Sequence, residues 1–516
     1  MSVAFSSEEP ATLDNDQCDS VVPPSSGVQR RPTPVPRLQL FVIILIQIAE
    51  PITATVIYPF VNQFVRDTGV TQGDERKTGY YAGLIESVFF LAEALTVFQW
   101  GWLSDQLGRK PVLLLGPLGL TISMLGFGLS KTFVPLVLFR CMQGVFNGNI
   151  GVSKSVLAEI SDETNIGDLF SMLPLMWSMG ITVGPIIGGV FANPADRWPA
   201  VFGHIELLKE HPYLIPCAMA GCLAMTSFMV GLVALRETLP SAPIRQRCAT
   251  CVKRNLRRLS VKLEVGLPFL ESSTTIPDYG SIESYGKDDP ASKKTLSDNH
   301  QKSSYRNLLV RPLLMTYLNY FFIAFTEMAH NALLPLMYSS SISLGGLGLD
   351  AYSIGMLMGT FGLVNATLQL KYLGRLTRRY GPRLIYICSY MSFLICIGLF
   401  PLASHFCKRA GRVDWIVGSL VFVQLAAQIP ILACYASMHI LVVSHAPKGH
   451  LGASNGIAQM IASIMRSIAP TVATSLFSVS LERSLAGGYM VYYILLVVVV
   501  VGIRISFLLP QSWVQT

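Results

Sequence analysis

The sequence predicts an all-α integral membrane protein with twelve transmembrane helices in two pseudo-symmetric six-helix halves. Only 14% of its 516 residues are charged and 51% are hydrophobic, whereas soluble proteins carry roughly 25% charged residues. About a dozen apolar runs have the roughly 20 residues that a helix needs to cross a bilayer. Because lipid offers backbone groups no partners and membrane strands are shorter, these runs must be helices.

The predicted helices form two groups of six. Their ranges are 38–65, 79–102, 112–130, 133–158, 168–192 and 212–235, then 308–338, 351–373, 383–404, 414–443, 450–480 and 488–509. The segment between the groups starts basic and continues rich in Ser, Asp and Lys, which is typical of a loop without a hydrophobic core. The predicted organisation is a disordered cytoplasmic tail at 1–37, six-helix halves at 38–235 and 308–510, a cytoplasmic central loop at 236–307 and a C-terminal tail at 511–516.

Charge and tail composition set the expected orientation. The tail at 1–37 lacks the basic start and apolar centre of a signal peptide, so we expect the run from Leu38 to direct insertion. Lys and Arg favour cytoplasmic termini, mainly through the central loop. The net charge of +8 suits an anionic membrane surface. No basic stripe with interleaved aromatic residues occurs, so we expect no nucleic-acid partner.

Signatures of enzymes and metal sites are missing from the sequence. It contains no G-x-x-x-x-G-K-[S/T] phosphate loop, no H-E-x-x-H and no G-x-S-x-G. Most of the 10 cysteines lie in apolar runs, where cysteine packs as a small hydrophobe. Cys248-x-x-Cys251 has no second pair for zinc, although reversible palmitoylation there stays open. We therefore expect no enzyme, no cofactor and no metal.

A polar segment at 101–111, here called the hinge segment, interrupts the apolar sequence between the second and third helices. A related segment at 374–383 follows the second helix of the other half, with Arg378 where the first copy has Asp105. Corresponding segments in two halves indicate duplication, which is common among secondary transporters. Five residues carry the pattern of glycines, acid and bases in the first copy: Gly101, Asp105, Gly108, Arg109 and Lys110.

Charged residues inside the predicted helices are candidates for function, because each costs about 2.5–3.5 kcal/mol on insertion scales. The proton-coupling candidates are Glu50, Glu86, Glu93, Arg140 and Glu327. A carboxyl group buried in a membrane can load and release a proton near neutral pH. Arg140 needs an acid or several carbonyls as partners. The alternative is structural, with each acid paired to a base on a neighbouring helix.

Two further patterns leave both a functional and a structural interpretation open. Glu327 and His330 lie three residues apart on one helix face, as a proton relay or as a hydrogen-bonded structural pair. The fifth helix carries a small-residue pattern that predicts either a bend at the seam between the halves or simple close packing. Its residues are Gly180, Gly184, Pro185, Gly188 and Gly189.

Three motifs together resemble the major facilitator superfamily, in its twelve-helix drug:proton antiporter branch. They are Gly101-x-Leu103-x-Asp105-x-x-Gly108-Arg109-Lys110, Leu136-x-x-x-Arg140-x-x-Gln143-Gly144 and Gly180-x-x-x-Gly184-Pro185-x-x-Gly188-Gly189. Phe146 and Asn147 depart from the small residues usual after the second motif, which questions close packing there. The resemblance covers about residues 37–510.

A narrower resemblance is to a fungal group related to the plant zinc-induced facilitators. It rests on Gln39-Leu-Phe41, on Ala49-Glu50-Pro51 with Pro59, and on Ala92-Glu93-Ala94. The superfamily resemblance implies that the halves rock around a central site. It also implies that the five hinge residues form a conformational latch, in which Asp105 meets a neighbouring helix end and Arg109 pairs with an acid across the cytoplasmic face. The substrate would lie between the halves, with Tyr58, Trp177, Tyr320, Phe325 and His330 in its walls.

The sequence thus favours a proton-coupled secondary transporter that exports drugs, toxins or secondary metabolites. The expected partners are the lipid bilayer, protons and a small-molecule substrate, and the expected state is a monomer with both termini in the cytoplasm. The plasma membrane is the expected location, and the vacuolar membrane stays open. A facilitator of a metal chelator or organic acid is one alternative, and a transporter-like nutrient sensor is another.

Overall fold

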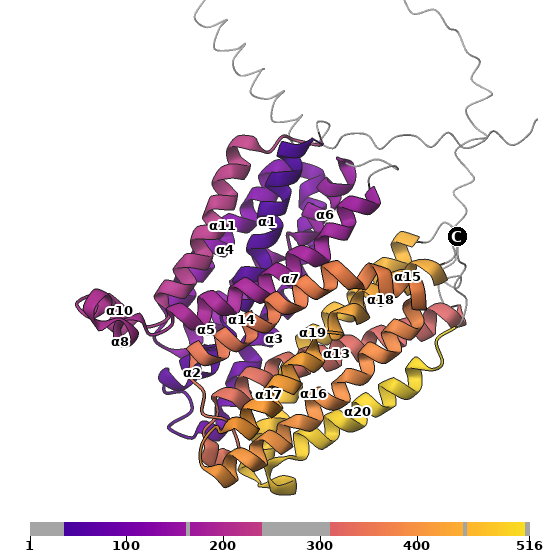
Figure 1. Cartoon of the computed structure of the whole chain (residues 1–516). Coiled ribbons are helices and arrows are strands. Elements are labelled where there is room, and N and C mark those ends of the chain that lie inside the picture. Colours follow the sequence, from indigo (N-terminus) through magenta and orange to yellow (C-terminus); the bar gives the residue numbers. More distant parts are fainter. Residues whose placement is uncertain (1–35, 161–165, 240–309, 447–450, 511–516) are drawn as a thin grey trace, which may run out of the picture.

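The computed structural model describes residues 36–160, 166–239, 310–446 and 451–510, which form helices and loops without a strand (Figure 1). Apart from short ends, the tail predicted at 1–37 and the central loop predicted at 236–307 lie outside the described residues, as does the whole of 511–516. The described part confirms the all-α membrane fold.

The first six predicted spans each coincide with one helix or with two consecutive helices. They are α1 (Arg37–Thr55) with α2 (Val61–Asp67), α3 (Thr78–Leu107), α4 (Arg109–Gly128), α5 (Phe133–Asn147) with α6 (Ile150–Glu159), α7 (Ile166–Phe191) and α11 (Leu214–Ala234). Three short helices join α7 to α11, namely α8 (Pro194–Arg197), α9 (Pro199–Phe202) and α10 (Glu206–Glu210). A single turn, η1 (Glu75–Lys77), precedes α3.

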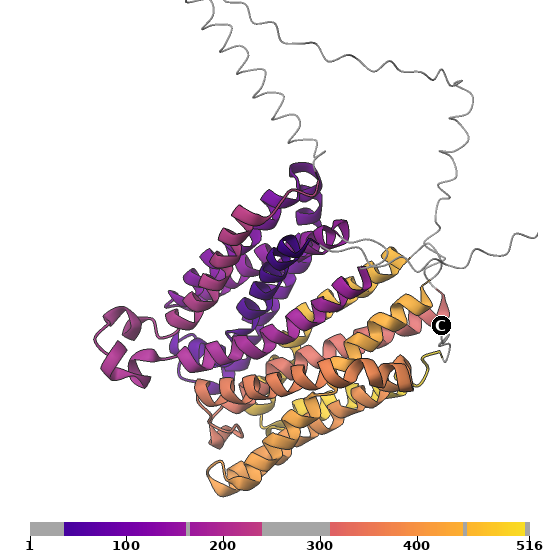
Figure 2. The same ribbon diagram turned by 45° about the horizontal axis from the view of Figure 1, so that its top comes forward.

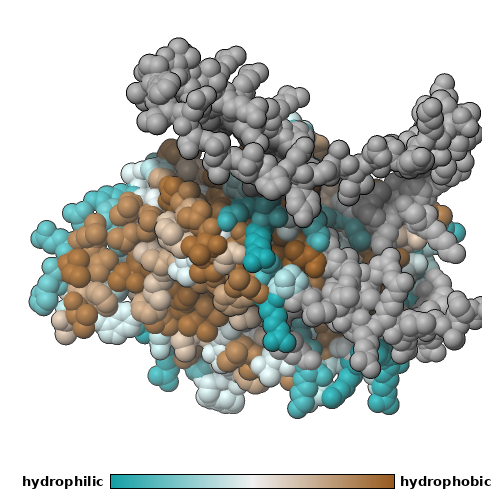
Figure 3. Space-filling view, turned by 90° about the horizontal axis from the view of Figure 1, so that it is seen from above, coloured by the Kyte–Doolittle hydropathy of each residue, from teal (hydrophilic) through white to brown (hydrophobic). Residues whose placement is uncertain are grey.

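The second six predicted spans repeat this arrangement. They are α13 (Arg311–Ser339), α14 (Ala351–Leu368) with η4 (Gln369–Leu373) and α15 (Gly374–Tyr380), α16 (Pro382–Ala410), α17 (Trp415–Gln428) with α18 (Ile431–His445), α19 (Leu451–Glu482) and α20 (Met490–Ser506). Within the described ranges, eight helical stretches are long and apolar enough to cross a membrane. In Figure 3 hydrophobic residues form a broad band, and hydrophilic residues gather at the left edge.

The two halves meet along two pairs of helices, α3 with α19 and α7 with α14 (Figure 1, Figure 2). Glycines permit this approach. A Cβ atom at Gly83 of α3 would lie 1.9 Å from Thr474 Oγ1 of α19. A Cβ at Gly355 of α14 would lie 2.7 Å from Gly189 Cα of α7. Small residues at such crossings bring backbones into contact, which drives helix association in membranes.

The hydrogen bonds that join the halves, among described residues, all lie on the side opposite the hinge segment. Arg66 donates to the Ser339 carbonyl (3.4 Å), and the Ser341 amide donates to Glu75 (3.0 Å). Tyr80 donates to Glu482 (3.2 Å). Thr471 of α19 bonds to two α3 residues, donating to the Gly83 carbonyl and bonding to Ser87. The structure is therefore closed on this side, and the described residues contain no hydrogen bond or ion pair between the halves near 101–111.

Replacing Gly355 by valine should open this seam. The added Cβ would lie 2.4 Å from the Pro185 carbonyl oxygen and 2.7 Å from Gly189 Cα, and backbone atoms cannot move aside as a side chain can. We expect Gly355→Val to lower stability by roughly 1–3 kcal/mol, measured by thermal denaturation in detergent. Gly398→Val is the matched control, because a Cβ there meets nothing within 4 Å. Equal denaturation midpoints for the two variants would contradict a tight seam.

Candidate functional site

Three helices of the first half bring two acids and an amide together. Asn147, the last residue of α5, donates from Nδ2 to Glu50 of α1 and to Glu93 of α3, at 3.0 Å each. Glu50 is 7% exposed and Asn147 is 3% exposed. One amide nitrogen thus uses both of its hydrogens to bridge two carboxylates in the interior of the membrane domain.

Close packing of α5 on α3 places Asn147 beside these acids. A Cβ at Gly144 would lie 2.1 Å from the Phe89 carbonyl oxygen, so only glycine allows the contact. Thr96 and Trp100 of α3 both donate to the Val145 carbonyl, at 3.2 Å and 2.6 Å. These bonds anchor the end of α5. The departure from small residues at 147 therefore leaves the packing intact and adds a polar bridge.

Two bases complete the cluster, and one of them belongs to the other half. Lys154 of α6 and Arg466 of α19 both act electrostatically on Glu50 and Glu93. The Arg466 guanidinium lies 6.0 Å from the Trp177 ring centre and 5.8 Å from that of Tyr435. Arginine over aromatic rings is a stabilising cation–π arrangement. We call Glu50, Glu93, Asn147, Lys154 and Arg466 the central cluster, and it spans the seam between the halves.

Glu327 reaches this region through a tyrosine rather than through His330. Tyr435 donates to Glu327 at 2.5 Å and also faces Arg466. His330 instead lies 3.5 Å from the Gln428 side chain and packs on Phe393 and Phe400. The predicted pairing of Glu327 with His330 is wrong, because the histidine ring turns into the apolar core of the second half.

Arg140 finds its partners among neutral groups. Its side chain is fully buried, donates to the Ala54 carbonyl (3.1 Å) and to Gln143 (2.6 Å), and lies 4.2 Å from the Phe89 ring centre. No carboxylate lies within ion-pair distance of Arg140 among the described residues. Glu86 acts electrostatically on both Arg140 and Tyr58. Arg140 and Glu86 thus form a second polar set, distinct from the central cluster.

The predicted wall residues divide between the seam and the core. Trp177 flanks Arg466 and Tyr58 contacts Glu86, while the Tyr320 ring meets Tyr435 edge-on at 6.0 Å. Phe325 packs against the hydrophobic core of the second half, as His330 does. The structure therefore brings Tyr58, Trp177 and Tyr320 near the charged groups, whereas Phe325 and His330 pack on apolar residues of the second half.

The small residues of α7 serve close packing. A Cβ at Gly180, Gly184 or Gly188 would lie within 2.3 Å of an α1 or turn atom, from Pro51, Thr55 and Val56 respectively. Thr55 also donates to the Gly180 carbonyl at 2.9 Å. Gly189 and Pro185 face Gly355 across the seam. α7 continues as a helix through this stretch, so the packing interpretation has direct support and the bend stays a prediction.

The hinge segment is held by contacts within the first half. Arg109 pairs with Asp105 at 2.6 Å, with Glu159 at the end of α6 at 2.9 Å, and donates to Ser104 at 2.5 Å. Lys110 donates to the Leu232 carbonyl of α11 at 2.8 Å. Arg109 therefore joins the start of α4 to the end of α6.

Asp105 does not meet a helix end in this structure. Its side chain is 59% exposed and, among the residues that the structure describes, pairs only with Arg109, one turn along its own chain. Glu237, beyond α11, is the acid at the N-terminus of α4, where it accepts from the amides of Arg109 (2.7 Å) and Lys110 (3.3 Å). Gly108, at the N-cap position with φ 104°, has no side chain to cap the helix, so a carboxylate from another segment does so.

Three residues of the central cluster and the hinge segment were not predicted from the sequence. Lys154 lies inside a predicted helix, so the rule that selected Arg140 also applies to it. Asn147 is uncharged and appeared only as a departure from a motif. Glu237 lies just past the sixth helix, where an acid is ordinary, and only the folded chain shows that it caps α4.

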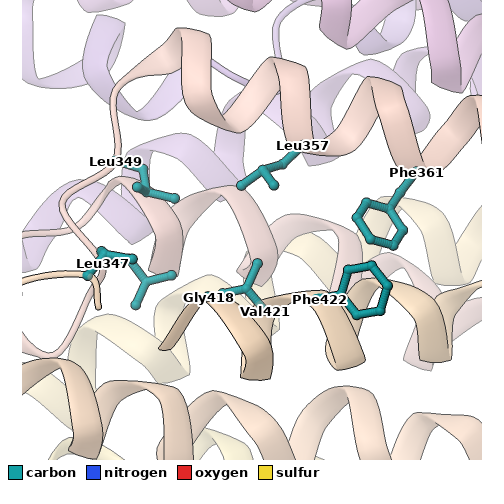
Figure 4. A pocket seen from close by; sticks show the side chains of 8 residues that line it. Leu347, Leu349, Leu357, Phe361, Gly418, Val421 and Phe422 are labelled. Carbon is teal, nitrogen blue, oxygen red and sulfur yellow. The ribbon is translucent and has the colours of Figure 1, made fainter. Parts of the chain in front are cut away.

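Two recesses in the described part lie away from the central cluster. One, of about 320 Å³, is lined by polar residues that include Asp67, Lys131 and Glu210. The other, of about 280 Å³, is apolar and lies between α14 and α17 (Figure 4). Neither is lined by Glu50, Glu93 or Arg466. The central cluster therefore lies outside both recesses.

Comparison with known proteins decides the family. Residues 43–470, and in a second match residues 316–512, fit the model of the Major Facilitator Superfamily. The chain belongs to this superfamily. It is therefore a multi-pass membrane transporter and not an enzyme.

Relatives with similar sequences are named as transporters. Major facilitator-type transporter psiT2 of Psilocybe cyanescens is 29% identical, over 97% of each chain. Major facilitator superfamily multidrug transporter mfsB of Aspergillus fumigatus is 28% identical, over 87% of this chain and 79% of its own length. Protein ZINC INDUCED FACILITATOR-LIKE 1 of Arabidopsis thaliana is 26% identical, over 92% and 91%. These similarities agree with the branch that the motifs indicated.

Solved structures share the fold at low identity. A bacterial homologue of the human lysosomal transporter Spinster, solved in an inward-facing and unoccupied conformation, matches with a TM-score of 0.62 and 14% identity, covering 92% of this chain and 98% of the other.

The hinge contacts yield a prediction about stability. Glu237→Ala should cost about 1 kcal/mol, because two amides at the N-terminus of α4 lose their acceptor. Asp105→Asn should cost less, because its partner contact is exposed to solvent. Thermal denaturation of both variants in detergent checks the order. A larger loss for Asp105→Asn would show that Asp105, not Glu237, stabilises the hinge segment in this conformation.

Proposed function

We propose that this transporter is proton-coupled and exports small organic molecules, such as drugs, toxins or secondary metabolites, by alternating access. The observation that carries the proposal is the bridge of Glu50 and Glu93 by Asn147, beside Arg466 of the opposite half. We take Glu50 and Glu93 as the proton-accepting pair, and Arg466 as the base of the other half in the same electrostatic network.

Two carboxylates that share one amide repel each other when both are ionised, and the repulsion is strong in a medium of low dielectric constant. One added proton relieves it. The same proton reduces the attraction between the Glu50–Glu93 pair and the two bases, Lys154 and Arg466. Because Arg466 lies on α19 and the acids lie on the other half, proton loading changes the energy that holds the halves together at this level. A ligand or proton with such a differential effect shifts the balance of conformations.

Substrate would compete with protons for the Glu50–Glu93 pair and would bind near Tyr58, Trp177 and Tyr320. A substrate with a cationic group would be held by the ionised acids and released when they are protonated, which is the exchange that a proton antiporter needs. Glu86, Arg140 and Glu327 form the adjoining polar sets and are proposed as further proton-coupling residues. Phe325 and His330 stay proposed wall residues, at the side that packs against the core of the second half.

The latch and the orientation complete the proposal. With the hinge segment in the cytoplasm, as the Lys and Arg distribution favours, the structure is closed toward the exterior and suited to collecting substrate from inside. Gly101, Asp105, Gly108, Arg109 and Lys110 would then bind across the halves in the alternate state. We further propose a monomer in the plasma membrane, with halves at 38–235 and 308–510, a cytoplasmic loop at 236–307 between them, and both termini cytoplasmic.

Glu50→Gln should abolish transport driven by a pH gradient. Glutamine can still accept a hydrogen bond from Asn147 but cannot bind and release a proton. We expect exchange of labelled for unlabelled substrate without a gradient to continue, because exchange requires only alternating access. Both assays use reconstituted vesicles and a compound chosen by a resistance screen.

Glu210→Gln is the matched control for this assay. Glu210 lies in α10, outside the membrane-spanning helices, where hydrogen bonding to Lys131 at 2.7 Å lowers its pKa. The control should behave like the unaltered protein. Transport by Glu50→Gln that still follows the pH gradient would remove Glu50 from the coupling mechanism.

A second candidate function is a facilitator of a metal chelator or organic acid. The observation that favours it is the pair of bases, Lys154 and Arg466, which would attract a carboxylate between the halves. A relative is also named as zinc-induced facilitator-like. An anion would bind best when the acids are protonated, so it would move together with protons rather than against them.

The two candidates differ in the sign of coupling. For an exported cation, inhibition of transport by an aromatic amine should exceed inhibition by the carboxylic acid of the same ring, and Arg466→Gln should leave this order unchanged. For an organic acid, the carboxylic acid should inhibit more strongly, and Arg466→Gln should remove that inhibition by roughly tenfold or more, the effect of one charge-assisted bond. Competition assays in vesicles measure both.

A further inference from the structure

An apolar slot runs between α14 and α17 in the second half. It has a volume of about 280 Å³. In Figure 4 Leu349, Leu357 and Phe361 line one side, and Gly418, Val421 and Phe422 line the other. Each lining residue is apolar, so a water molecule inside would lack the polar partners that it needs.

The slot has the length of one bilayer leaflet. It starts at Leu349, in the turn before α14, and at its inner end the Phe361 and Phe422 rings meet at 5.5 Å. From the start of α14 to Phe361 the helix rises by about 15 Å, at 1.5 Å per residue. The hydrocarbon core of a bilayer is about 30 Å thick. The slot therefore extends from one membrane face to about the middle of the membrane.

The slot exists because α14, a helix of the second half, packs mainly against the first half. α14 lies along α7 of the first half over most of its length, but contacts α13 and α17 of its own half only over short stretches. A Cβ at Gly418 of α17 would meet no atom within 4 Å, so the protein itself leaves this space open. Phe422 is 62% exposed at its flank. Lipid has direct access to the slot at that flank.

In the sequence, exposed arginines neighbour Val413, a residue at the membrane-face end of the slot. Val413 lines it, and Arg412 precedes Val413 in the loop between α16 and α17. Arg409, in the last turn of α16, is also exposed. Neither arginine forms an ion pair among the described residues. The neighbouring acids, Asp350 and Asp414, accept from helix amides at 3.1 Å and 3.0 Å and thus serve as N-caps. Exposed guanidinium groups match the charge and geometry of a phosphate.

We propose that the slot binds one acyl chain of a membrane phospholipid, with the phosphate at Arg412. The chain fills the space between α14 and its own half. This inference does not depend on proton coupling or on the identity of the transported compound.

The test uses the full chain, purified in detergent and stripped of lipid. Dioleoyl-phosphatidylglycerol is added, and bound lipid is counted by native mass spectrometry. Gly418→Leu should weaken binding at one site by about tenfold, because the new side chain displaces roughly two methylene groups. Gly418→Ala should give an intermediate loss if the larger variant folds poorly. Gly398→Leu is the control, since a Cβ there also meets nothing within 4 Å but does not line the slot.

A second arm tests the phosphate. Arg412→Gln should weaken binding of dioleoyl-phosphatidylglycerol and leave binding of dioleoylglycerol, which has the same chains without phosphate, unchanged. Equal lipid binding by Gly418→Leu, Gly418→Ala and the unaltered protein would overturn the slot as a chain site. Equal loss for both lipids, or no loss, in Arg412→Gln would overturn the headgroup position.

Discussion

Contact between helix backbones across the seam is the constraint on which the rest of this structure depends. Gly83 against α19, and Gly189 against Gly355, leave no room for a side chain. Lipid tails are as apolar as the side chains they would replace, so burial of apolar surface does not by itself hold two halves together in a membrane. Van der Waals contact and the hydrogen bonds of Thr471 do so instead. Because these contacts lie on one side, the halves can separate on the other.

The polar groups lie in two places, the hinge segment and the seam between the halves, and their contacts differ. At the hinge segment, Arg109, Glu159 and Glu237 bind residues of the first half and make its ends a rigid unit. At the seam, Arg466 faces acids of the opposite half. Rigidity within a half and adjustable attraction between halves are the two requirements of a rocking transporter. The bonds at one level can persist while those at the other change.

The helices could be predicted from the sequence because a membrane demands long apolar runs, and no tertiary contact alters that demand. Glu50 and Glu93 could be chosen as candidates for a related reason, since charge in a helix interior is costly wherever the helix packs. Asn147 and Glu237 could not be chosen in this way, because only their contacts in the folded chain single them out. Asn147 reaches Glu50 on another helix, and Glu237 reaches the start of α4 from beyond the end of α11. The pairing of Glu327 with His330 was wrong for the same reason: three-residue spacing shows that two side chains share a face, but neighbouring helices decide which partner each one contacts.

The two hinge copies share a backbone shape although their side chains have diverged. Gly108 and Gly381 both end a helix, both start the next one, and both have positive φ, at 104° and 77°. The first copy surrounds its glycine with acids and a paired arginine, whereas Arg383 of the second donates to the Phe507 carbonyl. The second copy can thus serve as an internal comparison for the first. A property common to both copies reports on the turn itself, and a property found only in the first reports on the charges added to it.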